Sequence, residues 1–472
     1  MVYSTDRPPG RGPVVAIIGA GASGTLTAVH LLLRAAAERR ALRVALIDRH
    51  GRYGLGQAYS TTHPAHLVNS PAGRMSGLAG DPAHLMRWAD AAGIAHDGFL
   101  PRRAYGRYLR DMLADAERQA RSVARVVQLT SEVVAIRRAG LARPIRLHLA
   151  ADGRVDADMA VLATGSLPPA PPFPVPGTDR YIADPWSPGA LDGTGDGSPV
   201  VVLGTGPTMM DVAIAVTDAD PRAVVHAISR HALLPRTHDY PPAAPSAARP
   251  VLPGAPGTVR LAAAMRHVRA AVAERPGDWQ QVIDAVQLQI PQLWRRLPAQ
   301  DKHLFLRHVA RYWEVHRHRA PPATARRISE LRSAGRLSVL RGRVVLCADE
   351  PGGLRLRIEQ DGRMTELGAG WLVNATGPAP DITASSDPLL RSLIGGGLAR
   401  PDLLRLGIDA GPDGAVRDAA GEPADDIFTL GPPLRGLWYE TTAIPEIRDQ
   451  AAALARRLCA AIEAREYPGT AA

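Results

Sequence analysis

Cysteine and lysine are nearly absent from this sequence. Only two cysteines, Cys347 and Cys459, occur in 472 residues, and they are too far apart to form a CxxC pair. This excludes a disulfide framework, a thiolate-based metal site and a dithiol relay of the thioredoxin-reductase kind. Lys302 is the only lysine, so arginine supplies the other 55 of the 56 basic residues. Together with abundant alanine, this indicates a base-composition bias in the coding DNA rather than a polycationic surface.

Aromatic residues and long apolar runs are also scarce. Aromatic residues make up 4% of the chain and the arginines are spread along it, so the net charge of +10 does not predict binding to nucleic acid. No apolar run approaches the roughly 20 residues of a transmembrane helix. Residues 1–13 are polar and rich in Pro and Gly, without the apolar centre of a signal peptide. We therefore expect a disordered N-terminus and a cytoplasmic protein without a membrane partner.

The first informative motif is a glycine turn after an apolar run. Residues 14–18 (VVAII) lead into Gly19-Ala20-Gly21-Ala22-Ser23-Gly24. Gly19 permits a tight exit from a strand, Gly21 lets the backbone approach a pyrophosphate, and Gly24 lets a helix pack against the sheet. The first N–H groups of that helix, at Ala22 and Ser23, would face the phosphates. A second apolar run ends in Asp48, where an acid accepts hydrogen bonds from a ribose, and the next residue, Arg49, is a further candidate cofactor ligand.

A second glycine turn departs from this pattern. Residues 200–203 lead into Gly204-Thr205-Gly206-Pro207-Thr208-Met209, in which Met209 replaces the third glycine and Pro207 stiffens the loop. The partner run 224–228 ends in Ser229 and Arg230, where the first unit has an acid. A guanidinium at this position is expected to hold a 2′-phosphate, which favours NADPH. The alternative is that Arg230 is one of many surface arginines.

Each unit closes with an apolar run that ends in Ala-Thr-Gly, at Thr164-Gly165 and at 376–377. The small residues would leave room for a cofactor where the chain returns to the sheet. A late short strand, 426–431, ends in Gly431, and a helix follows from residue 444 with Glu446 and Ile447 in its first turn. In flavoproteins such a strand and helix complete the FAD domain, and the helix dipole stabilises negative charge on the reduced ring. Pro432 stands where an acidic residue commonly follows the glycine.

The predicted fold class is α/β, with two Rossmann-like dinucleotide-binding domains, one for FAD and one for NADPH, together with β-meanders and a helical insertion. The predicted boundaries are 14–190 and 365–472 for the FAD domain, 196–345 for the NADPH domain, about 258–335 for the insertion within it, and 346–364 for a connecting β-segment.

Five segments resemble those of a known group of proteins. They are 54–60 (GLGQAYS), 66–76 (HLVNSPAGRMS), 101–109 (PRRAYGRYL), 312–319 (YWEVHRHR) and 442–448 (TAIPEIR). They resemble bacterial FAD/NAD(P)-binding proteins that include L-aspartate N-monooxygenases and an FAD-dependent urate hydroxylase. The resemblance implies a single-component monooxygenase with a flavin C4a-hydroperoxide sheltered by NADP⁺. It also implies that Gln57, Asn69 and Met75 line the isoalloxazine; the alternative is an ordered loop packed on the FAD domain.

Candidate substrate residues come from two segments of the second unit. Arginines that reach a cleft would hold a carboxylate bidentately, which suits an acidic amino acid such as aspartate; the alternative is a solvated basic face. The candidates are Arg236, His238 and Tyr240 after the NADPH strand, and Arg311, Arg317, His318 and Arg319 in the insertion. His316 and His318 form an HxH pair without an evident third ligand, so no metal site is predicted. No catalytic side chain is predicted, because the cofactor carries the oxygen chemistry.

The favoured function is therefore FAD- and NADPH-dependent hydroxylation of a small polar metabolite with O₂, above all N-hydroxylation of an amino acid such as L-aspartate. Three alternatives stay open: a urate-type C-hydroxylase, an FAD/NADPH oxidoreductase or oxidase without oxygen insertion, and a non-catalytic FAD-binding redox sensor. A homo-oligomer also stays open.

Overall fold

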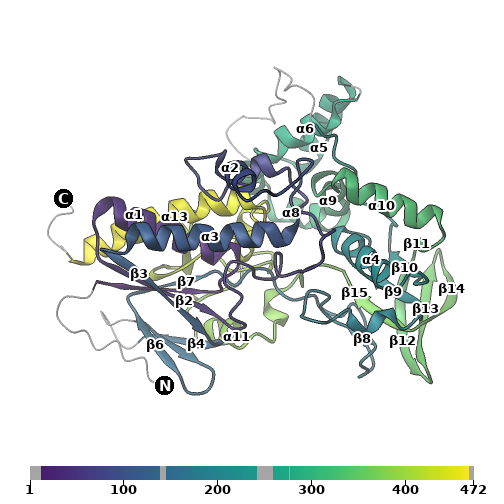
Figure 1. Ribbon diagram of the computed structural model, residues 1–472, viewed down its shortest axis with the longest axis horizontal. Coiled ribbons are helices and arrows are strands. Elements are labelled where there is room, and N and C mark those ends of the chain that lie inside the picture. The colour runs from purple at the N-terminus through teal and green to yellow at the C-terminus, as the bar shows by residue number, and fades with distance from the viewer. Residues whose placement is uncertain (1–11, 139–144, 242–258, 276, 467–472) are drawn as a thin grey trace.

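Two mainly parallel β-sheets organise the chain (Figure 1). The computed structural model describes residues 12–138, 145–241, 259–275 and 277–466, so nearly all of the segment predicted to be disordered, 1–13, lies outside the described residues. Within that range one sheet has six strands in the order β16-β17-β7-β1-β2-β3, and the other has five in the order β11-β10-β9-β15-β8. The predicted α/β class with two Rossmann-like units is confirmed.

The first sheet is buried on both faces. Along β1 (Val14–Ile18), Val15 and Ile17 belong to one core, while Ala16 and Ile18 belong to the other. This alternation is typical of a parallel strand that is covered on both sides. The other strands of the sheet are β2 (Leu42–Asp48), β3 (Ala124–Thr130), β7 (Met159–Leu162), β16 (Ala415–Arg417) and β17 (Pro423–Thr429).

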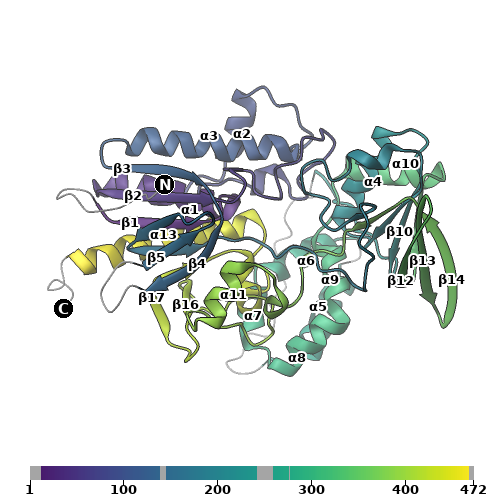
Figure 2. The same ribbon diagram turned by 90° about the horizontal axis from the view of Figure 1, so that it is seen from below.

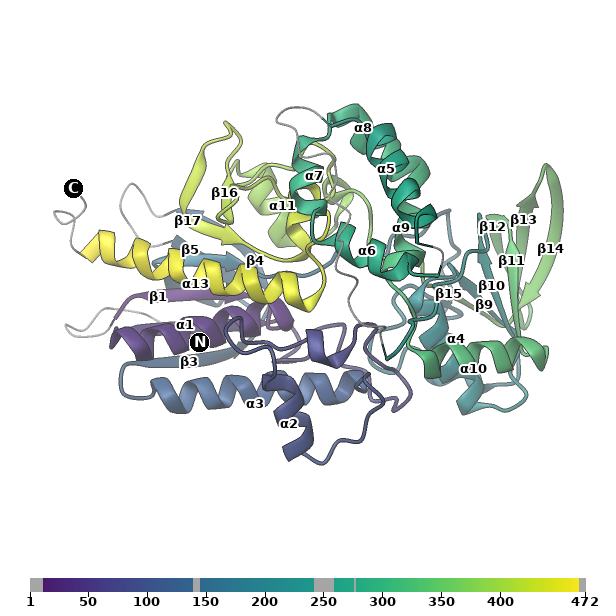
Figure 3. The ribbon, with the colours of Figure 1, turned by 90° about the horizontal axis from the view of Figure 1, so that it is seen from above.

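The two faces of this sheet have different covers. An antiparallel meander and one short helix cover one face (Figure 2); they are β4 (Val133–Arg138), β5 (Ile145–Leu149), β6 (Arg154–Ala157) and α11 (Pro388–Gly395). Three long helices cover the other face, with α1 between its two neighbours (Figure 3); they are α1 (Ala22–Glu38), α3 (Arg102–Ala120) and α13 (Ile444–Glu466). The C-terminal helix therefore returns to the domain that the N-terminal strand begins.

The second sheet is built in the same way. Val200 and Val202 on β9 face the core under the helices, and Val201 and Leu203 face a meander on the other side. The strands are β8 (Tyr181–Ile182), β9 (Val200–Leu203), β10 (Val225–Ser229), β11 (Leu337–Arg341) and β15 (Trp371–Asn374). The helices are α4 (Pro207–Ala219) and α10 (Pro322–Ser333), and the meander is β12 (Arg343–Glu350), β13 (Gly353–Gln360) and β14 (Arg363–Ala369).

The predicted domain boundaries differ from the structure at two places. β8 and β15 pair in parallel with each other and β15 with β9, so 181–182 and 371–374 lie in the second sheet, not in the FAD domain as predicted. The segment predicted to be a connection, 346–364, is part of the meander that covers this sheet. The physical reason is that β15 buries apolar residues against β9, as β7 does against β1.

The helical insertion forms a small core of its own. Its helices are α5 (Leu261–Ala273), α6 (Trp279–Gln287), α7 (Ile290–Arg296), α8 (Ala299–Leu304), a π-helical turn (Phe305–Val309) and α9 (Ala310–Arg317). Trp294 and Phe305 pack there with Leu404 and Tyr439 from the C-terminal part of the chain. The insertion thus lies beside the first domain (Figure 3), while α10, predicted as its last part, packs on α4 in the second domain.

Short elements complete the chain and connect the domains. They are a 3₁₀ turn (Ala72–Arg74), α2 (His84–Ala91), 3₁₀ turns at Asp192–Gly195, Ile382–Ala384 and Pro432–Leu434, and α12 (Arg435–Trp438). At the domain junction, Arg102 Nη2 on α3 lies 2.8 Å from Asp211 Oδ2 on α4, and both side chains are mostly buried. Among the described helices, none combines the length and apolar character that a membrane span requires.

Candidate active site

The first glycine turn has the geometry that its sequence predicts. Gly19 has φ +99°, and its N–H donates to Ile47 O at 2.8 Å. A Cβ on Gly19 would clash with the carbonyl of Ala163, and a Cβ on Gly24 would clash with the carbonyl of Gly19. Glycine is therefore required at both positions, because β1, β7 and α1 approach so closely.

Asp48 braces the loop that surrounds this turn. Its Oδ2 accepts from Ala20 N at 3.2 Å, and its Oδ1 accepts from His50 N at 2.9 Å and Arg52 N at 3.1 Å. The N–H groups of Ala22 and Ser23 begin α1, where no preceding turn offers them carbonyls. Arg49, predicted as a cofactor ligand, instead pairs with Asp387 at 2.9 Å and Glu132 at 3.4 Å. Its guanidinium is engaged by a different part of the domain.

Gly431 connects the C-terminal segment to the first turn of α1. It has φ +72°, and a Cβ there would lie 2.6 Å from Ser23 Oγ and 3.8 Å from Ile447 Cγ1. Its N–H donates to Gln450 Oε1 at 2.7 Å, and its carbonyl accepts from Thr441 Oγ1 at 3.0 Å. The late strand and helix thus meet the first glycine turn, as the sequence predicts. Glu446, in the first turn of α13, accepts from Gln287 Nε2 at 2.9 Å.

The second glycine turn repeats the first. Gly204 has φ +107°, its N–H donates to Ile228 O at 2.8 Å, and a Cβ there would clash with the carbonyl of Ala375. Met209, where the first unit has its third glycine, is fully buried in the core of the second domain. Pro207 is the first residue of α4, where a missing N–H costs nothing. The departures from the fingerprint therefore leave the turn itself intact.

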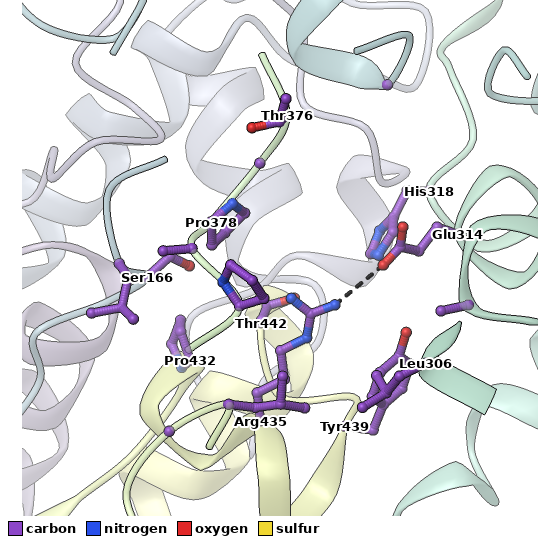
Figure 4. Close-up of a pocket in the computed structure, with 18 of the residues that line it drawn as sticks. Ser166, Leu306, Glu314, His318, Thr376, Pro378, Pro432, Arg435, Tyr439 and Thr442 are labelled. Carbon is purple, nitrogen blue, oxygen red and sulfur yellow. Dashed lines mark hydrogen bonds and ion pairs between the residues drawn. The ribbon is translucent and has the colours of Figure 1, made fainter. Parts of the chain in front are cut away.

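One cavity of about 770 Å³ joins the two units (Figure 4). The first unit contributes Thr164, Gly165 and Pro432, and the second contributes residues 204–208 with Thr376 and Gly377. At Gly165, Gly206 and Gly377 an added Cβ would meet no described atom within 4 Å. Small residues at these points thus leave open space beside the backbone, which is what a bound dinucleotide needs. The residues present fit the cofactors that the sequence predicts.

A smaller adjoining cavity of about 240 Å³ lies between the second turn and Arg230. Arg230 makes no hydrogen bond or ion pair with any residue that the structure describes. Its neighbour His231 accepts from Arg311 Nη1 at 2.5 Å, and burial together with the nearby arginines lowers the pKa of this histidine. Ser229 on the same rim hydrogen-bonds the Thr205 hydroxyl at 3.0 Å. An unpaired guanidinium in a positive rim fits the 2′-phosphate of NADPH.

Of the three residues predicted to line a flavin, the structure brings one to the cavity. Asn69 lines it, and its carbonyl accepts from His238 Nε2 at 2.9 Å. Met75 is buried in the core of the first domain, because an apolar side chain gains more there than in a polar cleft. Gln57 donates to Asp184 Oδ2 at 3.0 Å and is not among the lining residues. The placement of Gln57 and Met75 beside a flavin therefore stays a prediction, since the first glycine turn does not line this cavity either.

The substrate candidates also separate into two groups. Arg311 and His318 line the cavity. Arg236 is exposed outside it, Tyr240 packs its ring 5.2 Å from that of Phe99, and His238 is held by Asn69. The arginines at positions 317 and 319 are buried in ion pairs with Glu440 and Asp284. The prediction that they reach the cleft is corrected: both form ion pairs inside the protein. A buried guanidinium is stable only beside a carboxylate, which these two arginines find in the protein itself.

The sequence analysis missed a polar wall of the cavity, to which the insertion contributes Glu314. The wall consists of Glu314, Arg435, Tyr439 and Thr442 (Figure 4), together with Glu440. Arg435 Nη2 donates to Glu314 Oε1 at 3.1 Å, and burial raises the pKa of Glu314. Glu314 does lie in the segment 312–319 singled out by resemblance, but Arg435 follows Gly431 by four residues without a motif.

His318 is a further ionisable group that lines the cavity. Burial, with Arg317 and Arg435 nearby, lowers the pKa of His318 to about 3, so the imidazole is neutral around pH 7. Among the described residues no cluster of three His, Cys, Asp or Glu side chains could hold a metal ion. The charged machinery of the cavity is therefore made of arginine and glutamate.

Comparison with known proteins supports the assignment of the first unit. Residues 16–167, which run from β1 to just beyond the Thr164-Gly165 terminator, match the model of a family described as FAD-NAD(P)-binding. The uncharacterized protein YdhS of Escherichia coli (strain K12) is 27% identical over 218 residues, which cover 43% of this chain and 39% of YdhS. The similarity therefore spans less than half of that relative.

Solved structures are similar over nearly the whole chain. The reduced form of ornithine hydroxylase PvdA from Pseudomonas aeruginosa has a TM-score of 0.62 at 15% identity, covering 96% of this chain and 100% of that one. The ornithine N-hydroxylase KtzI of Kutzneria sp. 744, with reduced FAD, NADP⁺ and L-ornithine, has a TM-score of 0.60 at 19% identity and the same coverage. At these identities the likeness is one of fold, and it agrees with the predicted pair of Rossmann-like domains.

Proposed function

We propose that this protein is an FAD-dependent, NADPH-using monooxygenase that N-hydroxylates a small amino acid, with L-aspartate as the leading candidate. One observation carries the proposal: the two glycine units share a single cavity. Thr164, Gly165 and Pro432 line it from one side, and Gly206, Thr376 and Gly377 line it from the other. Electrons pass directly between two cofactors only where their reactive ends meet, and this cavity would allow FAD and NADPH to meet in that way.

Each cofactor has a set of residues that would hold it. The first glycine turn, the N-terminus of α1 and Asp48 would hold FAD, and the Gly431 loop closes the same site. The second turn, with Ser229 and Arg230, would hold NADPH. When bound, the pair supplies the electrons and the oxygen activation that protein side chains cannot supply. The fold shared with the two ornithine hydroxylases supports this division of roles.

The protein itself would position the substrate and shield it from water. Apolar side chains form much of the cavity wall, among them Leu306, Ile382, Leu390, Leu404 and Ile408. They would limit the access of bulk water to the reacting centre, where water would otherwise quench activated oxygen. The polar wall with Glu314, Arg435 and Thr442 would orient a polar substrate. His318, which is neutral, offers a hydrogen-bonding group without adding charge.

The proposal is tested by product analysis. Purified protein supplied with FAD should be yellow, and L-aspartate should accelerate NADPH oxidation and yield a product one oxygen atom heavier, with little peroxide. Urate belongs in the same panel, because C-hydroxylation of an electron-rich ring is the second oxygenase reaction that the resemblance implies. Complete release of oxygen as H₂O₂ with every compound would identify an oxidase or reductase. Bound FAD that NADPH does not reduce would identify a redox sensor.

A further inference from the structure

The arginines that line the cavity are placed at two different ends. Arg230 and Arg311 also line the smaller cavity at the second glycine turn, where phosphates are expected. Arg435 lies elsewhere, at the start of α12, directly after the 3₁₀ turn that follows Gly431. It lines the large cavity and not the smaller one. A nucleotide-binding role therefore accounts for the first two arginines and leaves Arg435 without one.

The guanidinium of Arg435 is only partly satisfied. Its Nη2 donates to Glu314 Oε1 at 3.1 Å, which is its one described bond to a carboxylate, and 29% of the side chain remains exposed. An arginine can offer two parallel N–H groups to a carboxylate, and the pair with Glu314 uses one of them. The other acid on this wall, Glu440, is already engaged by Arg317 Nε at 3.2 Å and Trp313 Nε1 at 2.8 Å. Arg435 thus keeps donors that face the cavity.

The neighbouring Tyr439 is held in a strained backbone conformation. It has φ +60° and ψ −58°, and Glu440 N donates to Trp438 O at 2.8 Å across it, which makes a γ-turn. Non-glycine residues adopt this conformation rarely, and such strain concentrates at binding sites. The turn places the Tyr439 ring 5.4 Å from Arg435 Cζ. Burial raises the pKa of the Tyr439 hydroxyl and the Arg435 guanidinium beside it opposes that rise, but no described residue forms a well-aligned hydrogen bond with this hydroxyl.

We propose that Arg435, together with the Tyr439 hydroxyl, binds a carboxylate group of the substrate, and that Glu314 holds the guanidinium in place until that carboxylate takes over. The inference rests on the proposed function and specifies its substrate class, an acid rather than a simple amine. A planar carboxylate would use both parallel N–H groups of Arg435 and give the orphaned hydroxyl an acceptor. The sequence analysis predicted that Arg317 holds a substrate carboxylate, and this role is here assigned to Arg435.

Binding of matched probes to the FAD-loaded protein tests this assignment. Succinate and L-aspartate should bind saturably in calorimetric titrations, while succinamide, the neutral analogue of succinate, should bind at least about tenfold more weakly. Arg435→Gln should lose at least about tenfold in succinate affinity, and Arg435→Lys should recover part of it. Arg236→Gln, which removes an exposed arginine outside the cavity, is the matched control and should leave succinate affinity unchanged.

The variant Glu314→Gln distinguishes carboxylate binding by Arg435 from a purely structural role of Arg435. Removing the competing carboxylate should tighten succinate binding, because the guanidinium no longer has to leave an ionic partner. Equal affinity for succinate and succinamide in the natural protein, absence of saturable binding of both acids, or unchanged succinate affinity in Arg435→Gln would overturn the proposal. Reduction of the flavin by NADPH is measured separately on the natural protein; its failure would overturn the proposed function while the carboxylate titrations still report on Arg435.

Discussion

Arg317 on α9 lies buried against Glu440, with its Nε 3.2 Å from the carboxylate Oε2. The other carboxylate oxygen accepts from Trp313 Nε1 at 2.8 Å, and Glu446 Oε1 lies 3.8 Å from Arg317 Nη2. An arginine of the segment 312–319 thus connects the helical insertion to the loop that precedes α13. The same contacts hold Glu440 beside the strained turn at Tyr439.

Replacement of Arg317 should therefore lower the stability of the protein, and its main effect should not be on substrate binding. Arg317→Met would leave Glu440 buried without its cation, and breaking a buried pair in this way costs about 3–5 kcal/mol. Urea unfolding should show a lower midpoint. The double variant Arg317→Met with Glu440→Gln should recover much of the loss, because no unpaired charge remains. A midpoint unchanged by Arg317→Met would contradict the assignment of this pair.

The glycine turns were predictable because backbone geometry alone dictates them. At Gly19 and Gly204 the chain leaves a strand with positive φ and passes the carbonyls of Ala163 and Ala375 so closely that only glycine fits. Spacing along the sequence carries this information directly. The Ala-Thr-Gly terminators and the return of residues 431–466 to the first domain followed from the same local signals.

The contacts that individual arginines make could not be predicted in this way. Arg230 and Arg317 have the same chemistry, yet one is free at a cavity rim and the other is paired inside the protein. The difference depends on where Glu440 lies, and that is set by contacts between segments more than a hundred residues apart. For the same reason the sequence did not point to Arg435, whose partner Glu314 lies on the insertion.

Arg230 should determine the preference of the protein for NADPH over NADH. Loss of a charge-assisted bond to a 2′-phosphate costs about 1.5–3 kcal/mol, so Arg230→Ala should raise KM for NADPH about 10- to 100-fold. KM for NADH, which has no such phosphate, should change little. Steady-state NAD(P)H oxidation with both coenzymes measures this, with Arg236→Ala as the control for loss of an exposed arginine. An equal rise for both coenzymes would remove the 2′-phosphate role.

His238 should make the stability of the protein sensitive to acid. Burial, with Arg319 nearby, lowers the pKa of His238 to about 4, and its Nε2 donates to Asn69 O at 2.9 Å. The unfolded chain takes up a proton near pH 6.5 that the folded protein excludes, so this histidine lowers the unfolding free energy as pH falls from 6.5 towards 4.

His238→Gln should therefore reduce the pH dependence of unfolding. Between pH 6 and pH 5 the unfolded chain holds most of one proton that the folded protein excludes, so the variant should lose a slope of about 1.2 kcal/mol per pH unit. Urea unfolding at several pH values measures the slope. His148→Gln, at an exposed position on β5, is the control. Identical slopes for His238→Gln and the natural protein would show that His238 is not excluded from protonation.

Substitutions at two glycines of the second turn should have different effects, one on cofactor binding and the other on folding. A Cβ at Gly206 would meet no described atom within 4 Å, and the extended backbone there, with φ −81° and ψ −170°, suits any residue. Gly206→Ala should therefore fold with an unchanged unfolding midpoint. Its methyl group would occupy space beside the N-terminus of α4, where a pyrophosphate approaches the backbone, so KM for NADPH should rise at least about tenfold.

Gly204→Ala should have the opposite profile. Its φ of +107° and the clash with the carbonyl of Ala375 would strain the turn, at a cost of about 1–3 kcal/mol, so thermal unfolding should occur at a lower temperature. Measuring unfolding and NADPH oxidation for both variants tests the assignment in one experiment. If Gly206→Ala kept the natural KM for NADPH, the second turn would not be the place where the nucleotide binds, and the open space at Gly206 would need another occupant.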